Sequence, residues 1–468
     1  MKFDGGTEGT GELTWGQQGI WATMQKTGRT LNIGGAVALP AGMTAEDVAD
    51  ILRFIVSRHE ALRTRLRFVP GQRYPQQVVA ADGEITLHVA DVEAGHDAAQ
   101  AAEVLRVAYE LEPFDYEHEF PVRMAVVRQQ GYATHLVVQY CHIAVDGNGI
   151  DALVRDLAVM PDLDAPLPGI TPLVLAAEQQ GQAALRASRK SLRHWESILR
   201  TIPAHRYGNL RPVGPQEPRF WEIFCYSPAM YLALKVVARR VGVDTSHVLL
   251  ASFAVAFASI TGQPLSVTQA VVNNRFRPQL GGAVTQLCQN AITVLDTDGA
   301  DFDEIVARAW KAATSANLCG YYDSAAYDQM LARIADERGE DVDVSCFIND
   351  RRMPDHDGDL PTPMQVRAAL DRTVVRFDRQ QPVFDGRFFL QIDSAPDANV
   401  PGRLNPRESE LPAVYFALWA DTRYIPPAQM EAFARTFEAV TVQAALSPSA
   451  AAAIAVVPEA LSGDGGPG

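Results

Sequence analysis

The sequence of 468 residues has few cysteines and no long apolar segment, and both shortages limit what the protein can be. Its five cysteines are odd in number and none of them forms a CxxC pair, which argues against a disulfide framework and against a zinc site. The polar, glycine-rich start, MKFDGGTEGTGE, has no apolar stretch typical of a secretory signal. The longest apolar run, residues 248–260, is too short to span a bilayer. These absences predict a cytoplasmic protein with no metal site and no membrane partner.

Positive charge is also scarce. The chain has 41 Lys and Arg against 56 Asp and Glu, so its formal net charge is −15 at pH 7. Nucleic acid is therefore excluded as an expected partner, because no excess of positive charge is present to neutralise phosphates. The length and an apolar content of 47% predict instead a globular protein of two or three domains with a large core.

The residues best suited to chemistry lie in one short stretch, residues 140–149 (YCHIAVDGNG). The apolar, β-branched run before it predicts a buried strand, and the apolar spacing after it predicts a helix over residues 151–160. His142 then ends the strand, where an imidazole can take or orient the proton of an attacking amine or hydroxyl. Asp146 and Gly147 lie in the turn before the helix, and Gly147 leaves room for a ligand or an unusual backbone angle. A core histidine followed by an ordinary Asp-Gly turn would have the same pattern.

Two helices are predicted in the first part of the chain. Residues 13–25 have apolar side chains at helical spacing, with Thr14 as N-cap and Gln17 three residues later. Residues 44–60 form a clearer amphipathic helix that Thr44 caps, and a strand-like segment, ALRTRL, follows it.

Three segments, LTWGQQGIW, RHEALRTRL and CHIAVDG, occur in this order and resemble the first three core motifs of nonribosomal peptide synthetase condensation domains. The resemblance implies an α/β (α+β) fold of two chloramphenicol-acetyltransferase-like lobes, arranged as a V-shaped pseudo-dimer with a tunnel between them. We expect residues 1–172 to form one lobe and residues 173–450 the other. Residues 451–468, rich in Ala, Gly and Pro, suggest a disordered tail.

The same resemblance implies roles for the residues around His142. His142 would orient or deprotonate the acceptor, and Gly147 would open space at the turn. Asp146 would be architectural and pair with Arg63, since a buried carboxylate needs a partner. Cys141 stands where the family has its first histidine, and because neighbours on a strand point to opposite faces, we expect it to pack underneath. An activated Cys141 thiol is the alternative.

The second part of the chain follows a Pro- and Asp-rich boundary at residues 161–172. Residues 172–200 predict one two-faced helix whose apolar seam lies opposite a basic stripe. The stripe consists of Arg186, Arg189, Lys190 and Arg193. It is either an ordinary solvated face or the docking site of an acidic carrier protein.

Further segments match the family in the second part. Residues 245–263 resemble a buried helix of the second lobe, and residues 416–440 resemble its closing strand and helix. Residues 267–296 resemble a strand, an RxRPEL loop and an FVNT-type motif, through Arg275, Arg277, Pro278 and Asn290. Gln289 stands where the family has an aromatic residue, and we expect Gln289 and Asn290 to line the substrate tunnel. Residues 344–352 are strand-like but match no motif.

The resemblance implies transfer of an acyl or aminoacyl group from a phosphopantetheine thioester to an amine or hydroxyl. No bound cofactor is implied, because the pantetheine arm arrives on an acyl or peptidyl carrier protein, and the acceptor is a small molecule or carrier-bound. The sequence lacks a GGxS attachment site, an adenylation-type phosphate loop and a GxSxG elbow, so we expect a free-standing enzyme that meets its carrier in trans.

Two alternatives remain. One is a degenerate member of the family that recruits another enzyme, although such members usually lack the histidine found here at position 142. The other is a coenzyme-A-dependent acyltransferase of the same superfamily, whose plant branch has a DFGWG motif that is absent from this sequence.

Overall fold

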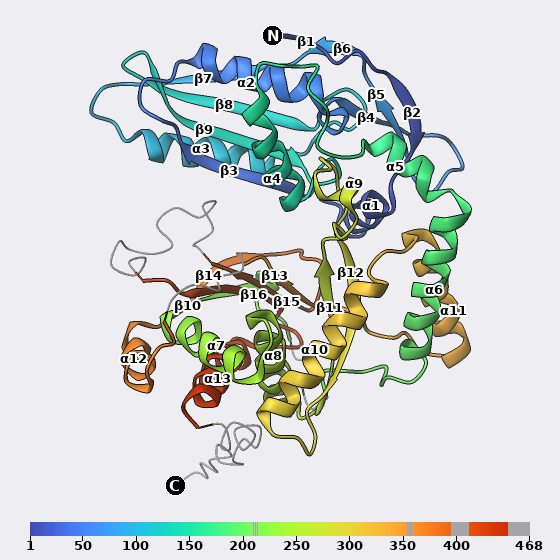
Figure 1. The fold of residues 1–468 in the computed structure, drawn as a ribbon, viewed down its shortest axis with the longest axis vertical. Coiled ribbons are helices and arrows are strands. Elements are labelled where there is room, and N and C mark those ends of the chain that lie inside the picture. The colour runs from blue at the N-terminus through green and yellow to red at the C-terminus, as the bar shows by residue number, and fades with distance from the viewer. Residues whose placement is uncertain (209, 211, 213, 353–358, 395–410, 448–468) are drawn as a thin grey trace.

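Two large β-sheets organise the chain in the computed structural model, which describes residues 1–208, 210, 212, 214–352, 359–394 and 411–447 (Figure 1). The first is built only from strands that precede residue 142 and the second only from strands that follow residue 219, and the parts of the chain that carry them are called the N-terminal half and the C-terminal half below. Helices cover both sheets, so the expected mixed α/β architecture is confirmed.

The N-terminal half contains a four-stranded sheet. Its strands run in the order β3 (Asn32–Ala38), β9 (Tyr132–Cys141), β8 (Val122–Gln129) and β7 (Leu87–Val92). Neighbouring strands are antiparallel except β7 and β8, which are parallel. Helix α2 (Ala45–Arg58) covers one face and α3 (Ala98–Leu111) the other (Figure 1), which explains the continuous apolar run of the central strands.

Two small sheets complete this half. One consists of β2 (Gly9–Glu12), β5 (Gln76–Val79) and β4 (Thr64–Arg67), and the other of β1 (Lys2–Asp4) and β6 (Asp82–Glu84). They bring the N-terminus beside the RHEALRTRL segment, whose middle part is a short 3₁₀ turn (Glu60–Arg63).

Both predicted N-terminal helices are confirmed. Helix α1 (Trp15–Thr27) begins with a capping box in which Thr14 and Gln17 bond each other's backbone N–H, and it ends at Gly28 in the left-handed conformation. Helix α2 has the same kind of box, formed by Thr44 and Asp47. Local sequence was sufficient to predict where both helices begin, because each box satisfies N–H groups that an uncapped helix leaves unpaired.

The C-terminal half contains a seven-stranded sheet. Its strands run in the order β12 (Gln289–Asp296), β11 (Leu265–Val272), β13 (Cys346–Asp350), β15 (Phe388–Asp393), β16 (Val414–Asp421), β10 (Phe220–Ser227) and β14 (Val374–Gln381). The strand-like segment predicted at residues 344–352 is β13. Strand β13 pairs in parallel with both of its neighbours, and the other pairs are antiparallel.

Helices pack on the lower face of this sheet as Figure 1 shows it: α7 (Pro228–Val241), α8 (Thr245–Thr261), α10 (Phe302–Cys319) and α13 (Pro427–Leu446). Helix α8 is the predicted buried helix, and it is apolar around most of its circumference because sheet and helices surround it. The largest hydrophobic core lies here and includes the mutually packed rings of Phe253, Phe257, Phe388 and Phe433. Helix α12 (Pro363–Ala369) packs against α7.

The long helix predicted over residues 172–200 is divided in the structure. It forms α5 (Pro172–Gln179) and α6 (Gln182–Leu199), with the break at Gly181, whose extended backbone makes it the N-cap of α6. Glycine permits this break because it is a poor helix former. The helix after the CHIAVDG segment also differs from its prediction over residues 151–160. Helix α4 (Gly147–Asp156) begins at residue 147, because Asp146 caps it.

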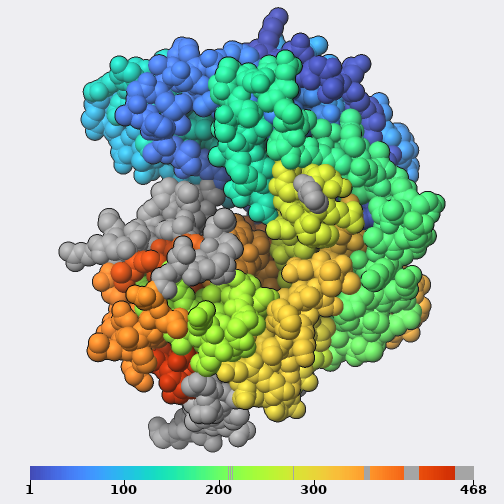
Figure 2. Space-filling model, in the orientation of Figure 1, coloured from blue at the N-terminus to red at the C-terminus, as the bar shows by residue number. Residues whose placement is uncertain are grey.

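The two halves are connected by more than the chain between them. Helix α5 lies beyond the predicted boundary at residue 172 yet packs against β2. In the opposite direction, the segment around α9 (Pro278–Gly281) leaves the C-terminal half and lies against the N-terminal half (Figure 2). The tail predicted at residues 451–468 lies outside the described residues.

None of the helices in the described part of the chain is by itself long and apolar enough to cross a membrane. Helices α7 and α8 reach that length only as a pair bent by 107°.

Candidate active site

His142 is the first residue after β9 and is held in one orientation by the turn that follows it. Its backbone N–H donates to the Leu31 carbonyl (2.8 Å), and its Nδ1 lies 3.0 Å from the Val145 carbonyl oxygen. A carbonyl can only accept, so this bond assigns the proton of the neutral ring to Nδ1 and leaves the lone pair on Nε2. The side chain is half-buried, whereas its neighbours Cys141 and Val145 are buried. His142 is thus suited to accept a proton through Nε2.

Asp146 is 1% exposed and joins the motif turn to the segment that crosses from the C-terminal half. Its Oδ1 accepts from the Gly149 N–H (2.8 Å), which caps α4, and lies 2.7 Å from Arg275 Nη2. Its Oδ2 accepts from Arg275 Nη1 (2.9 Å) and from the N–H groups of Leu287 (2.8 Å) and Cys288 (3.0 Å). With both oxygens used in this way, Asp146 supports the site and does not offer a base to a substrate.

The charge of Asp146 is maintained despite its burial. Burial alone would raise the pKa of this carboxyl, but Arg275 and the N–H donors of Leu287 and Gly149 outweigh that effect and hold the pKa below its ordinary value. Asp146 and Arg275 therefore form an ion pair at neutral pH.

The predicted pairing of Asp146 with Arg63 is wrong. Arg63 is 1% exposed, but its guanidinium donates to the carbonyls of Gly5, Thr7 and Ala80 and to the Thr7 hydroxyl. It therefore holds the N-terminal segment against β5. The partner of Asp146 is Arg275, which the sequence places in a segment resembling the RxRPEL loop of the family, and nothing in the sequence indicates which arginine Asp146 meets.

A second buried ion pair holds the other end of α4 and was not predicted. Arg58, in the RHE segment, donates from Nε (2.7 Å) and Nη2 (3.0 Å) to the two oxygens of Asp156. It also donates to carbonyls of the following loop, including that of Ala165 (2.9 Å). His59 lies 3.0 Å from Asp156, but burial lowers the pKa of His59 to about 4, against the pull of Asp156, so the ring is neutral near pH 7. Arg58 is therefore the cation that holds Asp156.

Gly147 and Gly149 differ in what a side chain would meet at each position. A Cβ on Gly147 would meet nothing within 4 Å, so the space beside the start of α4 is open. A Cβ on Gly149 would lie 2.6 Å from Val145 and 3.1 Å from the Thr285 carbonyl. Gly149 thus permits the crossing segment to approach α4, a role that the sequence did not reveal.

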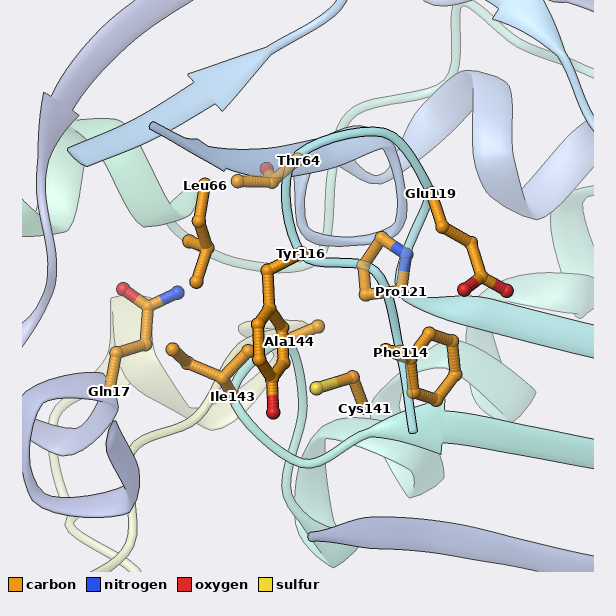
Figure 3. A pocket seen from close by; sticks show the side chains of 10 residues that line it. All are labelled: Gln17, Thr64, Leu66, Phe114, Tyr116, Glu119, Pro121, Cys141, Ile143 and Ala144. Carbon is orange, nitrogen blue, oxygen red and sulfur yellow. The ribbon is translucent and has the colours of Figure 1, made fainter. Parts of the chain in front are cut away.

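Cys141 points into a small chamber of the N-terminal half, where its sulfur faces the ring of Tyr116 (Figure 3). The chamber volume of about 20 Å³ is room for about one water molecule. Cys141 is 1% exposed, and burial raises the pKa of its thiol to about 12. A protonated, enclosed thiol is a poor nucleophile, which supports packing over covalent catalysis.

The two predicted tunnel residues lie at the start of β12. Gln289 is buried, and its Nε2 donates to the Tyr322 carbonyl (2.7 Å) and the Ser324 hydroxyl (3.2 Å). Ser324 in turn donates to the Trp15 carbonyl (2.7 Å), so Gln289 links the strand to α11 (Ser324–Arg338) and α1. Asn290 is half-buried and its side chain makes no hydrogen bond within the described part of the chain. Of the two, Asn290 is the one left available to a ligand.

The basic stripe is exposed as predicted, and only part of it faces a groove. Arg186, Arg189, Lys190 and Arg193 are all exposed on α6. Arg189 and Arg193 line a groove between α6 and α11, whose apolar residues include Leu192 and Met330.

Residues 7–326 match the family described as Condensation domain. The phosphinothricin tripeptide synthetase PhsC of Streptomyces viridochromogenes is 25% identical over 405 residues, which are 80% of this chain and 36% of PhsC. The cyclosporin synthetase simA of Tolypocladium inflatum is 26% identical over 291 residues, which are 60% of this chain and 2% of that synthetase. The chain therefore spans about a third of PhsC and a far smaller share of the fungal protein.

Several solved structures share the fold. SgcC5 from Streptomyces globisporus superposes with a TM-score of 0.68 at 17% identity, covering 94% of this chain and 99% of SgcC5. The condensation domain that mediates chain release from the enacyloxin polyketide synthase superposes with a TM-score of 0.68 at 17% identity, covering 96% of this chain and 85% of that one. The X-domain of teicoplanin biosynthesis, in its complex with OxyB, superposes with a TM-score of 0.65 at 17% identity, covering 94% of each chain. At these identities the likeness establishes the fold, and the match over residues 7–326 adds the family: the chain belongs to the condensation domains.

Proposed function

We propose that this protein transfers an acyl or aminoacyl group from a carrier-protein thioester to an amine or hydroxyl acceptor, with His142 at the reacting centre. The observation that carries the proposal is the bond from His142 Nδ1 to the Val145 carbonyl, because it leaves Nε2 as a positioned proton acceptor. The relatives PhsC and simA are named as synthetases, which supports a role in assembling natural products.

In the proposed reaction, the acceptor N–H or O–H donates to His142 Nε2 and its heteroatom attacks the thioester carbonyl carbon. The new C–N or C–O bond forms, the C–S bond then breaks, and the thiolate takes up the proton as the thiol leaves. The open space at Gly147 would admit the thioester, and the positive N-terminal end of α4 would stabilise the developing oxyanion. Asp146 and Arg275 would hold the turn that carries His142. The pantetheine arm belongs to the substrate and not to this chain.

The carrier protein is proposed to dock at the groove between α6 and α11. Arg189 and Arg193 supply positive charge there, beside the apolar side chains of Leu192 and Met330. The remaining surface belongs to a chain of net charge −15, so an acidic carrier would be steered toward this groove.

The function is tested by incubating the full chain with octanoyl-loaded carrier protein and a panel of amines and alcohols, with products read by mass spectrometry. Octanoyl-coenzyme A is the parallel donor. Product from the carrier thioester but not from the coenzyme supports the proposal, whereas efficient use of free octanoyl-coenzyme A would identify a coenzyme-A-dependent acyltransferase.

A non-catalytic member that recruits another enzyme is the second candidate, favoured by the replacement of the first motif histidine by Cys141 and by the shared fold of the X-domain in complex with OxyB. It predicts no product with any donor in this assay, together with stable binding of a partner enzyme from the same biosynthetic route.

A further inference from the structure

Helix α10 presents two large apolar side chains to solvent on its outer side. Trp310 is 49% exposed and Leu318 is 77% exposed, and Thr314, halfway between them, is also exposed. Because these residues are four apart, they lie along one side of the helix. The opposite side, which includes Phe302 and Ile305, is buried in the large core of the C-terminal half. Tryptophan is enriched at protein interfaces, so an exposed one beside an exposed leucine indicates a surface that contacts another molecule.

Helix α6 borders this side of α10 and is attached to it by hydrogen bonds. Nε2 of His194 lies 3.0 Å from the Ser315 hydroxyl, and the Ser191 hydroxyl donates to the Tyr321 carbonyl (3.3 Å) just after α10. The two helices therefore lie side by side, as the space-filling view also shows (Figure 2). Lys190 precedes Ser191 directly, so these bonds place it beside the last turn of α10.

Each of the two apolar side chains has a lysine near it. Lys311 follows Trp310 directly, and Lys190 lies beside the turn that carries Leu318. In agreement with this position, the charge of Lys190 opposes the rise that burial causes in the pKa of the neighbouring Cys319 thiol. Both lysines are exposed, and neither forms an ion pair within the described part of the chain. The surface formed by Trp310, Lys311, Leu318 and Lys190 is called the α10 face below.

The helical stretches that form the α10 face contain no acidic residue. Neither residues 182–195 of α6 nor residues 305–322, which include most of α10, contain Asp or Glu, although the chain has a formal net charge of −15. The two acidic residues in the first turn of α10, Asp303 and Glu304, are each paired with an arginine. The α10 face is therefore locally positive, so it attracts an acidic partner and repels the same face of a second copy.

We propose that the α10 face docks an acidic amphipathic helix of a partner protein. Trp310 and Leu318 are separated by a rise of about 12 Å along α10, which matches apolar side chains two turns apart on a partner helix. Carboxylates on the polar side of that helix would meet Lys190 and Lys311. The proposal goes beyond acyl transfer, because it holds whether or not His142 is catalytic. The partner is a protein other than the donor carrier, for which the groove between α6 and α11 is proposed.

The experiment measures binding of a fluorescein-labelled synthetic peptide to the full chain by fluorescence anisotropy. The peptide is a helix of about 18 residues with Leu on one side and Glu on the other. A peptide with Lys in place of Glu is the charge control, and vesicles that contain phosphatidylserine test a membrane as the alternative ligand. The variants are Trp310→Ala, Leu318→Ala, Lys190→Glu and Lys311→Glu. The matched controls are Leu111→Ala, at an exposed leucine of α3, and Arg239→Glu, at an exposed arginine of α7.

Trp310 supplies a second measurement of the same binding. All six tryptophans lie among the described residues, and Trp310 is the exposed one, whereas the other five are buried or half-buried. Acrylamide should therefore quench mainly the fluorescence of Trp310, and Trp310→Phe should remove that quenchable fraction. A helix bound at the α10 face would cover Trp310 and reduce the quenching.

The Leu/Glu peptide should bind the wild type and both controls alike. Binding should weaken by roughly tenfold or more in Trp310→Ala, and by less in Leu318→Ala and in each lysine reversal. Added salt should weaken the binding, because the charges that attract the peptide are exposed. The bound peptide should protect Trp310 from acrylamide. All four substitutions are at exposed positions, so the melting temperatures should stay close to that of the wild type.

Four results would overturn the proposal. Equal binding of the Leu/Lys peptide would remove the role of charge. Peptide binding that survives in all four variants, but is lost when Arg189 and Arg193 are reversed to Glu, would place the acidic helix in the groove between α6 and α11. Binding of phosphatidylserine vesicles without binding of the peptide would make the α10 face a membrane surface. No binding of the peptide to the wild type would make it an ordinary solvated face.

Discussion

Arg275 lies 129 residues after Asp146 in the sequence and forms with it a two-point buried ion pair, at 2.7 and 2.9 Å. This pair fixes the first residue before α4, and the pair of Arg58 with Asp156 fixes the last residue of the same helix. Helix α4, which follows the turn that carries His142, is therefore attached to the C-terminal half at its start and to the RHE segment at its end. The orientation of His142 depends on contacts from both halves of the chain.

Replacing Arg275 by Met should lower the free energy of unfolding by about 3–5 kcal/mol, because Asp146 would remain buried without its cation. Unfolding in urea measures the change. The control is Arg53→Met, which removes an exposed pair with Asp50 and should change the stability by less than about 1 kcal/mol. Equal stability of the wild type and Arg275→Met would contradict the supporting role of the pair.

His59 should make the protein less stable as the pH falls from about 6.5 to about 4. Its folded pKa of about 4 lies below the ordinary value of 6.5, so in this range the unfolded chain binds a proton that the folded chain does not. The free energy of unfolding should be lower by about 3 kcal/mol at about pH 4 than at about pH 6.5. Urea unfolding at a series of pH values should show a flatter profile for His59→Gln than for the wild type. Parallel profiles would mean that another group titrates.

His142→Ala should lower the turnover of carrier-bound donor by about 10²-fold or more, since the base that Nε2 provides is lost. Its melting temperature should stay close to that of the wild type because the side chain is only half-buried. His118→Ala, at an exposed histidine, is the matched control. A folded His142→Ala enzyme with near-normal turnover would remove His142 from the mechanism.

Cys141→Ala should retain most of the activity, because the thiol is enclosed and its pKa is raised to about 12 by burial. Iodoacetamide should modify Cys141 slowly in the folded protein. The fraction of activity lost should not equal the fraction of Cys141 that is modified. Mass spectrometry of the enzyme during turnover provides the decisive check, since an acyl group trapped on Cys141 would establish a covalent mechanism.

Reversing Arg189 and Arg193 to Glu should raise the KM for carrier-bound donor and leave kcat at saturation nearly unchanged, because exposed charges act mainly on the rate of encounter. The wild-type KM should rise between low and physiological ionic strength, and the reversed protein should lose that dependence. The control reverses Arg186 and Lys190, which lie on the same helix but do not line the groove. Equal effects of the two reversals would show that total charge matters and the groove does not.

The sequence by itself determined the features that depend on neighbouring residues. Thr14 with Gln17 predicted the start of α1, Thr44 as N-cap of an amphipathic segment predicted α2, and the apolar run of α8 predicted a buried helix. The order of three motifs led to the family and placed His142 at the end of a strand. The helices and the strand end were predicted correctly because the groups involved lie within a few turns of one another along the chain.

Only the tertiary structure decided the partners of the buried charges. Arg275 took the place predicted for Arg63, and Gln289 became a link between β12 and α11. Both outcomes depend on segments more than 30 residues apart, which meet across the two halves for Asp146 and Arg275 and within the C-terminal half for Gln289 and Ser324. A buried charge is stabilised by whichever group the fold brings within hydrogen-bond distance, and residue types along the chain do not specify that group.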